Sequence, residues 1–214
     1  MANTTRRKPT LAEEKALYTQ GYRLIAGVDE VGRGSLMGPV VAAAAIMPQK
    51  ITARWKSKVR DSKQLTPKAR EELFPYITEN AVCYGVGSMS NDIIDSIGIA
   101  KATCLAMIDA IEHLAPQPDY LLIDFLKLDL KIPQKGIVDG DSLCFSIACA
   151  SIIAKVTRDH AVQELDKVYP GYGFAGHKGY GTKEHIAALR KNGPCPLHRR
   201  SFSPVSDIIK ELGL

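Results

Sequence analysis

Apolar runs alternate with amphipathic segments along the chain, and this pattern predicts its secondary structure. Short apolar runs bounded by glycine, proline or polar residues are typical of strands, whereas apolar residues that recur roughly every three to four positions are typical of helices. Strands are expected at residues 22–28, 39–47, 81–90, 120–123 and 137–138. Helices are expected at residues 11–19, 67–79, 91–114, 142–169, 182–191 and 204–212. Early strands followed by strand–helix alternation favour an α/β fold whose mixed sheet is flanked by helices.

The length and composition fit one domain in a reducing compartment. With 214 residues, 45% of them hydrophobic, the chain can bury one core, and we expect a polar lead at 1–21 followed by a single domain at 22–214. The five cysteines are odd in number and lack the spacing of a disulfide framework. Residues 1–10 have no apolar signal segment, and the longest strongly apolar run, 40–47, is far shorter than the roughly 20 residues of a membrane span. No dimer interface is evident, so we expect a cytoplasmic monomer that is not associated with a membrane.

The positive charge of the chain is concentrated in its C-terminal third. Residues 155–200 contain nine Lys and Arg residues against four acids, an excess equal to the whole net charge of +5. A surface of this kind binds phosphates and makes nucleic-acid affinity depend on salt. The alternative is an ordinary solvated face, because a modest basic excess also occurs in proteins that bind no nucleic acid. The charge alone leaves both interpretations open.

Carboxylates follow apolar strands at three places. Asp29 and Glu30 end the first run, Asp124 ends another, and Asp141 follows a third. If these strands lie side by side, the acids converge, and their mutual repulsion raises their pKa values unless cations neutralise them. Oxygen ligands without a set of His or Cys suit Mg²⁺ or Mn²⁺ rather than zinc. The alternative is that each acid is a solvated residue at a strand end.

A glycine-rich turn follows the first two acids. In Gly32, Arg33 and Gly34, the glycines permit unusual φ values and a close approach of the backbone to a ligand, and the Arg33 guanidinium matches a phosphate. An ordinary tight turn is the alternative. Lys63, in a loop after Ser62, either contacts phosphate or is solvated.

Four further residues have two interpretations each. Asp159 is either a fifth acid near the site or half of an ion pair on a long helix. Cys195 and His198 have a spacing that suits metal ligands, but a packed turn is the simpler explanation. Tyr180 is either a core residue or, with its flanking glycines and basic neighbours, part of a substrate loop.

A colinear series of motifs over residues 22–206 resembles the signature of the ribonuclease HII family. The motifs are AGVDEVGRG at 26–34, GPVVAA at 38–43, DSKQL at 61–65, LID at 122–124, GDS at 140–142, ASIIAKVTRD at 150–159, HKGYGT at 177–182 and GPCPLHRRSF at 193–202. Because the motifs keep their order over most of the chain, a chance match is negligible.

This resemblance implies a fold and an activity. The fold is ribonuclease H-like, with a mixed five-stranded sheet flanked by helices and a C-terminal helical extension, so that residues 22–214 form the catalytic domain. The activity is hydrolysis of the RNA strand of RNA/DNA hybrids and incision on the 5′ side of single ribonucleotides embedded in duplex DNA. It leaves 3′-hydroxyl and 5′-phosphate ends.

The resemblance also assigns roles to residues. The family's four catalytic carboxylates, which hold two Mg²⁺ or Mn²⁺ ions, match Asp29, Glu30, Asp124 and Asp141 by motif. The glycine-arginine-glycine loop at 32–34 is expected to sense the ribose 2′-hydroxyl, and Tyr180 to stack at the RNA–DNA junction. Lys63 is added to the expected substrate-binding residues because of its place in the loop after Ser62, and not because of the resemblance.

Several positions depart from the family pattern. Ser35 replaces a usual proline, Phe125 replaces the glycine common after the third carboxylate, and Cys144, Phe145 and Cys149 replace smaller residues near the fourth. Phe125 either crowds the metal pocket or, by strand alternation, faces away from it.

Two related functions are alternatives. Ribonuclease HIII normally has a substantial N-terminal domain, which the 21 residues before the first strand do not accommodate. A protein that binds hybrids without cleaving them would lack one of the four acids, and all four are present.

Overall fold

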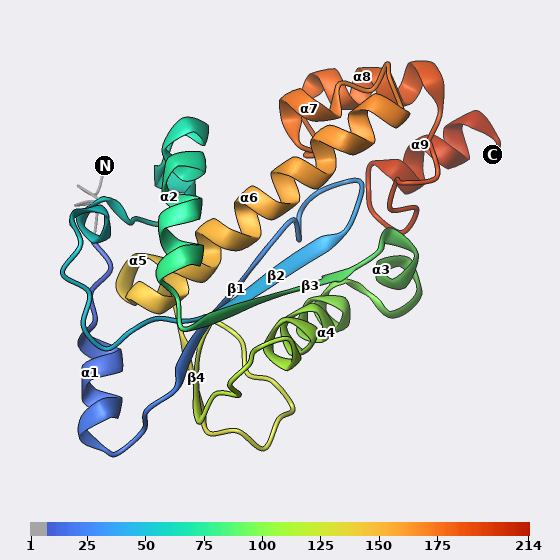
Figure 1. The fold of residues 1–214 in the computed structure, drawn as a ribbon. Helices are drawn as coiled ribbons and strands as arrows, with labels where there is room; N and C mark the ends of the chain where they lie inside the picture. The colour runs from blue at the N-terminus through green and yellow to red at the C-terminus, as the bar shows by residue number, and fades with distance from the viewer. Residues whose placement is uncertain (1–7) are drawn as a thin grey trace, which may run out of the picture.

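A mixed five-stranded sheet forms the centre of the computed structural model, which describes residues 8–214 (Figure 1). Its strands run in the order β3-β2-β1-β4-β5. They are β1 (Ile25–Val31), β2 (Val40–Ile46), β3 (Cys83–Met89), β4 (Tyr120–Asp124) and β5 (Gln134–Ile137). Strands β1, β2 and β3 pair antiparallel, and β4 and β5 continue the sheet parallel to β1. The predicted mixed sheet is confirmed.

Two helices cover opposite faces of this sheet (Figure 1). Helix α6 (Phe145–Val168) shares a buried cluster with Ala43 and Ala45 of β2. Helix α4 (Ile99–Glu112) shares another with Ala42 and Ala44, the alternate positions of the same strand. Because both faces are covered, β2 is buried at every position, which explains its continuous apolar run.

Helix α6 crosses the sheet closely at Gly27 of β1. A Cβ added to Gly27 would lie 2.1 Å from the backbone carbonyl carbon of Ser146, so a side chain at this position would displace the helix. This close approach places the first turns of α6 against β1, near the acidic end of that strand.

Two helices that the pattern predicts as continuous are each divided. The predicted helix at 91–114 is divided at Gly98, whose φ of +82° is not helical, into α3 (Asn91–Ile97) and α4. The predicted helix at 142–169 is divided at Cys144, whose backbone is extended, into α5 (Gly140–Leu143) and α6. Periodicity missed both breaks because residues on either side of each one enter the same buried cluster.

The remaining helices agree with the predictions to within a few residues. They are α1 (Ala12–Thr19), α2 (Pro67–Asn80), α8 (Lys183–Asn192) and α9 (Val205–Leu212), with a short α7 (Phe174–His177) and 3-10 turns η1 (Arg54–Lys58) and η2 (Ser62–Gln64). Thr66 caps α2 as predicted, because its hydroxyl accepts a hydrogen bond from the Ala69 N–H at 3.2 Å. Helices α7 to α9 form the C-terminal extension at one end of the sheet (Figure 1).

The edge strand β5 and the end of β1 differ from the prediction. The pattern placed a strand at 137–138, but β5 ends at Ile137 and most of it precedes that residue. Its Lys135 and Gly136 are exposed, so an apolar run could not reveal this strand. Strand β1 continues through Asp29 and Glu30 rather than ending before them.

Helix α1 packs onto the sheet-bearing part of the chain, although it belongs to the predicted polar lead. Its Leu17 joins a buried cluster with Ile25. Its Glu14 is 1% exposed and accepts hydrogen bonds from the Ser146 N–H at 2.8 Å and from the Cys144 thiol at 3.2 Å. Glu14 therefore anchors α1 at the beginning of α6.

Residues 1–7 of the predicted lead lie outside the described residues, and the boundary at residue 22 stays a prediction. Among residues 8–214, no helix has both the length and the apolar character needed to cross a membrane.

Candidate active site

The strand pairing brings three of the predicted acids together. Val28 of β1 pairs with Ile123 of the parallel strand β4. The next residue of each strand, Asp29 and Asp124, therefore lies beside the other. Glu30 is the next residue of β1, and each of the three carboxylates offers an oxygen within 4.8 Å of the other two. One end of the sheet thus carries a compact group of three acids.

Asp141 comes to this region from a different kind of element. It lies in α5 rather than at a strand end, and it is 4% exposed. It is not a member of the three-acid group, but the charge of Asp124 acts on it. Burial, followed by repulsion from Asp61, raises the pKa of Asp141 to about 6. Its Oδ2 atom lies 3.4 Å from the Lys63 ammonium.

Burial and repulsion also raise the pKa values of the three grouped acids. Burial is the main cause at Asp29, whose pKa lies well above its usual value, and the charges of Glu30 and Asp124 add to it. Burial raises the pKa of Glu30 although the Arg33 guanidinium lies 3.4 Å from its Oε1. Burial raises the pKa of Asp124 although the Gly140 N–H donates to its Oδ1 at 2.7 Å. A divalent cation would relieve this repulsion.

The donor atoms fit a hard divalent cation. The group consists of carboxylates, and neither His nor Cys takes part in it. Glu30 Oε2 is buried and has no hydrogen-bond partner in the described part of the chain, so it is free to serve as a ligand. Oxygen donors of this kind suit Mg²⁺ or Mn²⁺.

A cleft adjoins Glu30 and lies between the 32–34 loop and the loop that carries Tyr180. Its lining includes Glu30 and all five residues expected to bind substrate: Gly32, Arg33, Gly34, Lys63 and Tyr180. Gly32 has a φ of +93°, a backbone conformation that residues with a side chain rarely adopt. The turn after the acids therefore has a backbone conformation that favours glycine. It lines the same cleft as Lys63 and Tyr180.

Helix α6 contributes two cleft residues that the sequence analysis did not select, Ser151 and Lys155. The Ser151 hydroxyl donates to Ser62 Oγ at 2.9 Å, which connects α6 to the loop that carries Lys63. The Lys155 ammonium lies 5.9 Å from the centre of the Tyr180 ring. Both residues lie within one motif at a spacing of four, which places them on one face of a helix and could have indicated this role.

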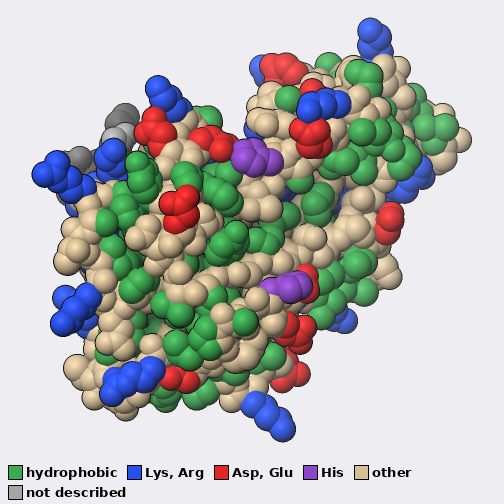
Figure 2. Space-filling model, in the orientation of Figure 1, with side chains coloured by type: hydrophobic (Ala, Val, Ile, Leu, Met, Phe, Trp, Pro, Cys, Tyr) green, Lys and Arg blue, Asp and Glu red, His purple; other side chains and the backbone are tan. Residues whose placement is uncertain are grey.

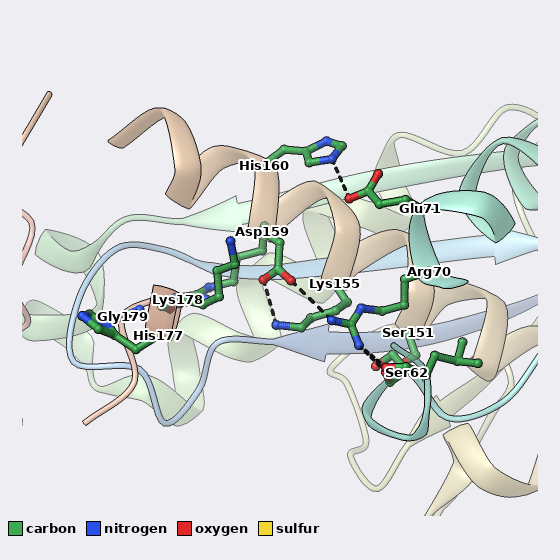
Figure 3. A network of polar contacts seen from close by, with 12 residues as sticks. Ser62, Arg70, Glu71, Ser151, Lys155, Asp159, His160, His177, Lys178 and Gly179 are labelled. Atoms are coloured by element: carbon green, nitrogen blue, oxygen red, sulfur yellow. Dashed lines mark hydrogen bonds and ion pairs between the residues drawn. The ribbon is translucent and has the colours of Figure 1, made fainter. Parts of the chain in front are cut away.

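Asp159 forms ion pairs on α6 (Figure 3). One of its carboxylate oxygens lies 2.7 Å from Lys155 Nζ, and the other lies 3.8 Å from an Arg70 nitrogen of α2. The acid thus connects two helices behind the cleft, which agrees with the ion-pair interpretation.

The basic C-terminal third exposes less charge than its composition indicates. Arg158 and Arg199 are fully buried. On the face drawn in Figure 2, Lys and Arg side chains are dispersed around the rim and do not form one patch. Because two of its nine basic residues are buried, this segment exposes less positive charge than a count along the sequence indicates.

Comparison with known proteins decides the family. The family model described as ribonuclease HII matches residues 26–205 of this chain. The chain belongs to the ribonuclease HII family. It is 57% identical to a ribonuclease HII of Dehalococcoides mccartyi over 95% of this chain and 97% of that protein. It is also 57% identical to a ribonuclease HII of Desulfitobacterium hafniense over 91% of this chain and 74% of that protein.

Solved structures agree with this membership. Ribonuclease H2 from Pyrococcus horikoshii is similar with a TM-score of 0.76 and 26% identity, over 89% of this chain and 99% of that one. Bst ribonuclease HIII, solved with Mn²⁺, has a TM-score of 0.69 and 21% identity, over 92% of this chain and 72% of that one, and this likeness shows the fold alone. The chain has the ribonuclease H-like fold and is a metal-dependent endoribonuclease of the ribonuclease H type.

Two departures from the ribonuclease HII pattern have structural explanations. Phe125 has a left-handed φ of 57°, which is why glycine is favoured there, and its side chain is 64% exposed and does not line the cleft. The exposed Phe125 side chain therefore does not crowd the cleft, and because β4 ends at Asp124, its position follows from the left-handed backbone and not from strand alternation. Ser35 is buried, and its hydroxyl donates to the Met37 carbonyl at 2.9 Å, so it helps to shape the chain after the 32–34 turn.

Cys195 and His198 form a packed turn. The Cys195 N–H donates to His198 Nδ1 at 3.0 Å, and the Cys195 thiol lies 3.1 Å from the same nitrogen. The second ring nitrogen of His198 lies 3.1 Å from His185 Nε2. These contacts use both ring nitrogens, which agrees with the packed-turn interpretation.

Proposed function

We propose that this ribonuclease HII hydrolyses the RNA strand of RNA/DNA hybrids and incises duplex DNA on the 5′ side of single ribonucleotides. The observation that carries the proposal is the cleft that joins the acids to the 32–34 loop and to Tyr180. The 2′-hydroxyl distinguishes RNA from DNA at one nucleotide, and backbone groups of a loop can contact it whatever the base. Specificity would then depend on the sugar rather than on the base sequence.

The four carboxylates would hold two divalent cations, Mg²⁺ or Mn²⁺. Such ions, when bound, activate a water and stabilise the departing 3′-oxygen, which leaves 3′-hydroxyl and 5′-phosphate ends. The chain orients the ligands, since the Gly140 N–H holds Asp124 and the Lys63 ammonium pairs with Asp141. Arg33, paired with Glu30, presents a further positive charge to the cleft.

Tyr180 is placed to contact the nucleotide next to the cut. Its ring is half-buried at the wall of the cleft, with Lys155 on α6 nearby. An aromatic ring that packs against the protein on one face and is open on the other can stack on an exposed base or sugar. We assign Tyr180 to the RNA–DNA junction on this basis.

The decisive experiment offers the protein duplex DNA that carries one ribonucleotide, with Mg²⁺ or Mn²⁺. We expect one incision on the 5′ side of the ribonucleotide and none with a chelator. Asp124→Asn should reduce cleavage by more than about 100-fold, since it removes a proposed metal ligand, while leaving substrate binding near the native level. The matched control is Asp129→Asn, because Asp129 is exposed and does not line the cleft.

Two results would contradict the proposal. Absence of incision by the native protein would exclude the enzymatic activity on this substrate and leave hybrid binding as the function. Cleavage by Asp124→Asn at the native rate would remove Asp124 from the metal site.

We also propose that the protein acts as a cytoplasmic monomer. All residues of the proposed site come from one chain, so cleavage does not require a second copy. Light scattering at micromolar concentration should give the mass of one chain of 23.3 kDa, and a dimer mass would contradict the proposal.

A further inference from the structure

Arg158 is a buried arginine that binds carbonyl groups. It lies on α6 and is fully buried. Its Nε donates to the Pro39 carbonyl at 3.1 Å, its Nη1 to the Lys178 carbonyl at 3.0 Å and its Nη2 to the Met37 carbonyl at 3.3 Å. The adjacent Asp159 forms its ion pairs with other side chains. Burying a charge is costly unless it is hydrogen-bonded, and these three bonds hold the guanidinium in place.

The acceptors of Arg158 belong to the two loops that line the substrate cleft. Two of the carbonyls lie just after the 32–34 loop, and the third lies two residues before Tyr180. The loops also meet directly, because the Leu36 N–H donates to the Gly179 carbonyl at 2.8 Å. Figure 3 shows Lys178 and Gly179 beside the part of α6 that carries Asp159. Arg158 therefore connects the helix behind the cleft to both of its walls.

Arg158 also contacts the two proposed recognition elements themselves. A Cβ added to Gly32 would lie 2.3 Å from Arg158 Nε, so the guanidinium packs against the Gly32 backbone. Its Cζ lies 5.7 Å from the centre of the Tyr180 ring. Glycine is thus required at position 32 by Arg158 as well as by the positive φ.

Arg199 anchors the first loop only. It is fully buried and donates to the Arg33 carbonyl at 2.9 Å and to the Gly38 carbonyl at 3.0 and 3.1 Å. Arg199 thus fixes the 32–34 loop. Arg158 bonds carbonyl groups on both sides of the cleft, so its bonds set the distance between that loop and Tyr180.

We propose that Arg158 is a positioning residue for substrate discrimination. Its guanidinium holds the 32–34 loop and Tyr180 at a fixed separation, so that sensing of the 2′-hydroxyl and stacking at the junction act on the same nucleotide step. This inference rests on the proposed function. A lysine keeps the charge but cannot bond three carbonyls in different directions, because it lacks the planar fork of donors.

The first test measures positioning without any substrate. Hydrogen exchange at the Leu36 amide reports the contact between the loops, since this N–H donates to Gly179. Arg158→Lys should accelerate this exchange by about 10-fold or more, which is the effect of losing one charge-assisted hydrogen bond. Arg190→Lys is the matched control, because Arg190 is 62% exposed and lies on α8, and it should leave the exchange unchanged.

The second test measures discrimination. On duplex DNA with one ribonucleotide, Arg158→Lys should raise KM by about 10-fold or more and change kcat by less than about 3-fold, since it displaces the recognition elements and not the acids. On a long RNA/DNA hybrid the rise in KM should be smaller, because a 2′-hydroxyl is present at every step and other registers are available. Arg190→Lys should match the native protein on both substrates.

Unchanged exchange at Leu36, or an equal loss on both substrates, would overturn the proposal. If Arg158→Lys does not fold, Gly32→Ala disturbs the same contact, because its methyl group would come within 2.3 Å of Arg158 Nε. It should accelerate exchange at Leu36 to a similar degree, and native exchange in this variant would also overturn the proposal. A native protein that does not incise would refute the proposed function, while the exchange measurement would still decide whether Arg158 positions the loops.

Discussion

Protonation of the buried pair His185 and His198 should destabilise the protein at mildly acidic pH. Because a carbonyl can only accept, His185 Nδ1, 3.0 Å from the Tyr180 carbonyl, carries a proton. His198 Nδ1 lies 3.0 Å from the Cys195 N–H, which can only donate, and 3.3 Å from the Cys195 carbonyl. We assign this nitrogen as the acceptor of the shorter contact, because a proton on it would leave two unprotonated nitrogens facing each other between His198 and His185. His198 Nε2–H then donates to the free His185 Nε2 at 3.1 Å. A further proton on either ring would bring two donors face to face.

The pKa values of the pair reflect this arrangement. Burial, followed by the charge of His185, lowers the pKa of His198 to about 4, and burial also lowers the pKa of His185. In the unfolded chain a histidine has a pKa of about 6.5. Between these values the unfolded state binds more protons, so stability is complete above the unfolded pKa and is lost as the pH falls towards the folded pKa. At pH 5 the loss from His198 alone is about 2 kcal/mol.

Urea unfolding at pH 7.5 and pH 5, followed through the fluorescence of the single tryptophan Trp55, measures this loss. A chelator keeps metal binding out of the comparison. His198→Phe should be less stable than the native protein at pH 7.5, but its stability should fall by about 2 kcal/mol less between the two pH values. His160→Gln is the matched control, since His160 is exposed on α6, and it should keep the native dependence. The reasoning is refuted if His198→Phe and the native protein lose the same stability.

Three further predictions concern backbone geometry and metal binding. Phe125→Gly should be neutral or stabilise the protein by up to about 1 kcal/mol, because relief of the left-handed φ exceeds the entropy cost of glycine; thermal unfolding with a loss above that size would contradict this. Gly27→Ala should destabilise by at least about 1–3 kcal/mol, because its methyl group meets the α6 backbone, whereas Gly176→Ala, which meets no atom within 4 Å, should change stability by less than about 1 kcal/mol. Saturating Mn²⁺ at about 100 times its Kd should stabilise the native protein by about 2.7 kcal/mol, and an equal shift in Asp29→Asn would remove Asp29 from the metal site.

Local pattern determined much of the fold, because burial of a strand or of one helix face imposes a spacing on the sequence. Strands β1 to β4 and helices α1, α2, α8 and α9 were predicted from this spacing. The spacing does not show where a helix is interrupted when both parts face one core, and this is why the breaks at Gly98 and Cys144 were missed. It also cannot show an edge strand with exposed side chains, and β5 was displaced for that reason.

The site divides in the same way. The sequence by itself determined the candidate residues, because their types and motifs limit the chemistry to carboxylates, a glycine turn and a tyrosine. The convergence of Asp29 and Asp124 followed from their places on two strands, once these strands were assumed to be neighbours. Only the tertiary structure decided that β1 and β4 are adjacent and that Asp141 arrives from α5.

The two buried arginines show the limit most clearly. Nothing in their local pattern separates Arg158 and Arg199 from the exposed basic residues around them, and composition counted them as surface charge. Their partners are carbonyl groups more than 100 residues away along the chain for most of the bonds. A carbonyl is present at every residue, so no sequence feature marks which ones a guanidinium will bind. Only the packing of α6 and of the C-terminal segment against the 32–34 loop decides it.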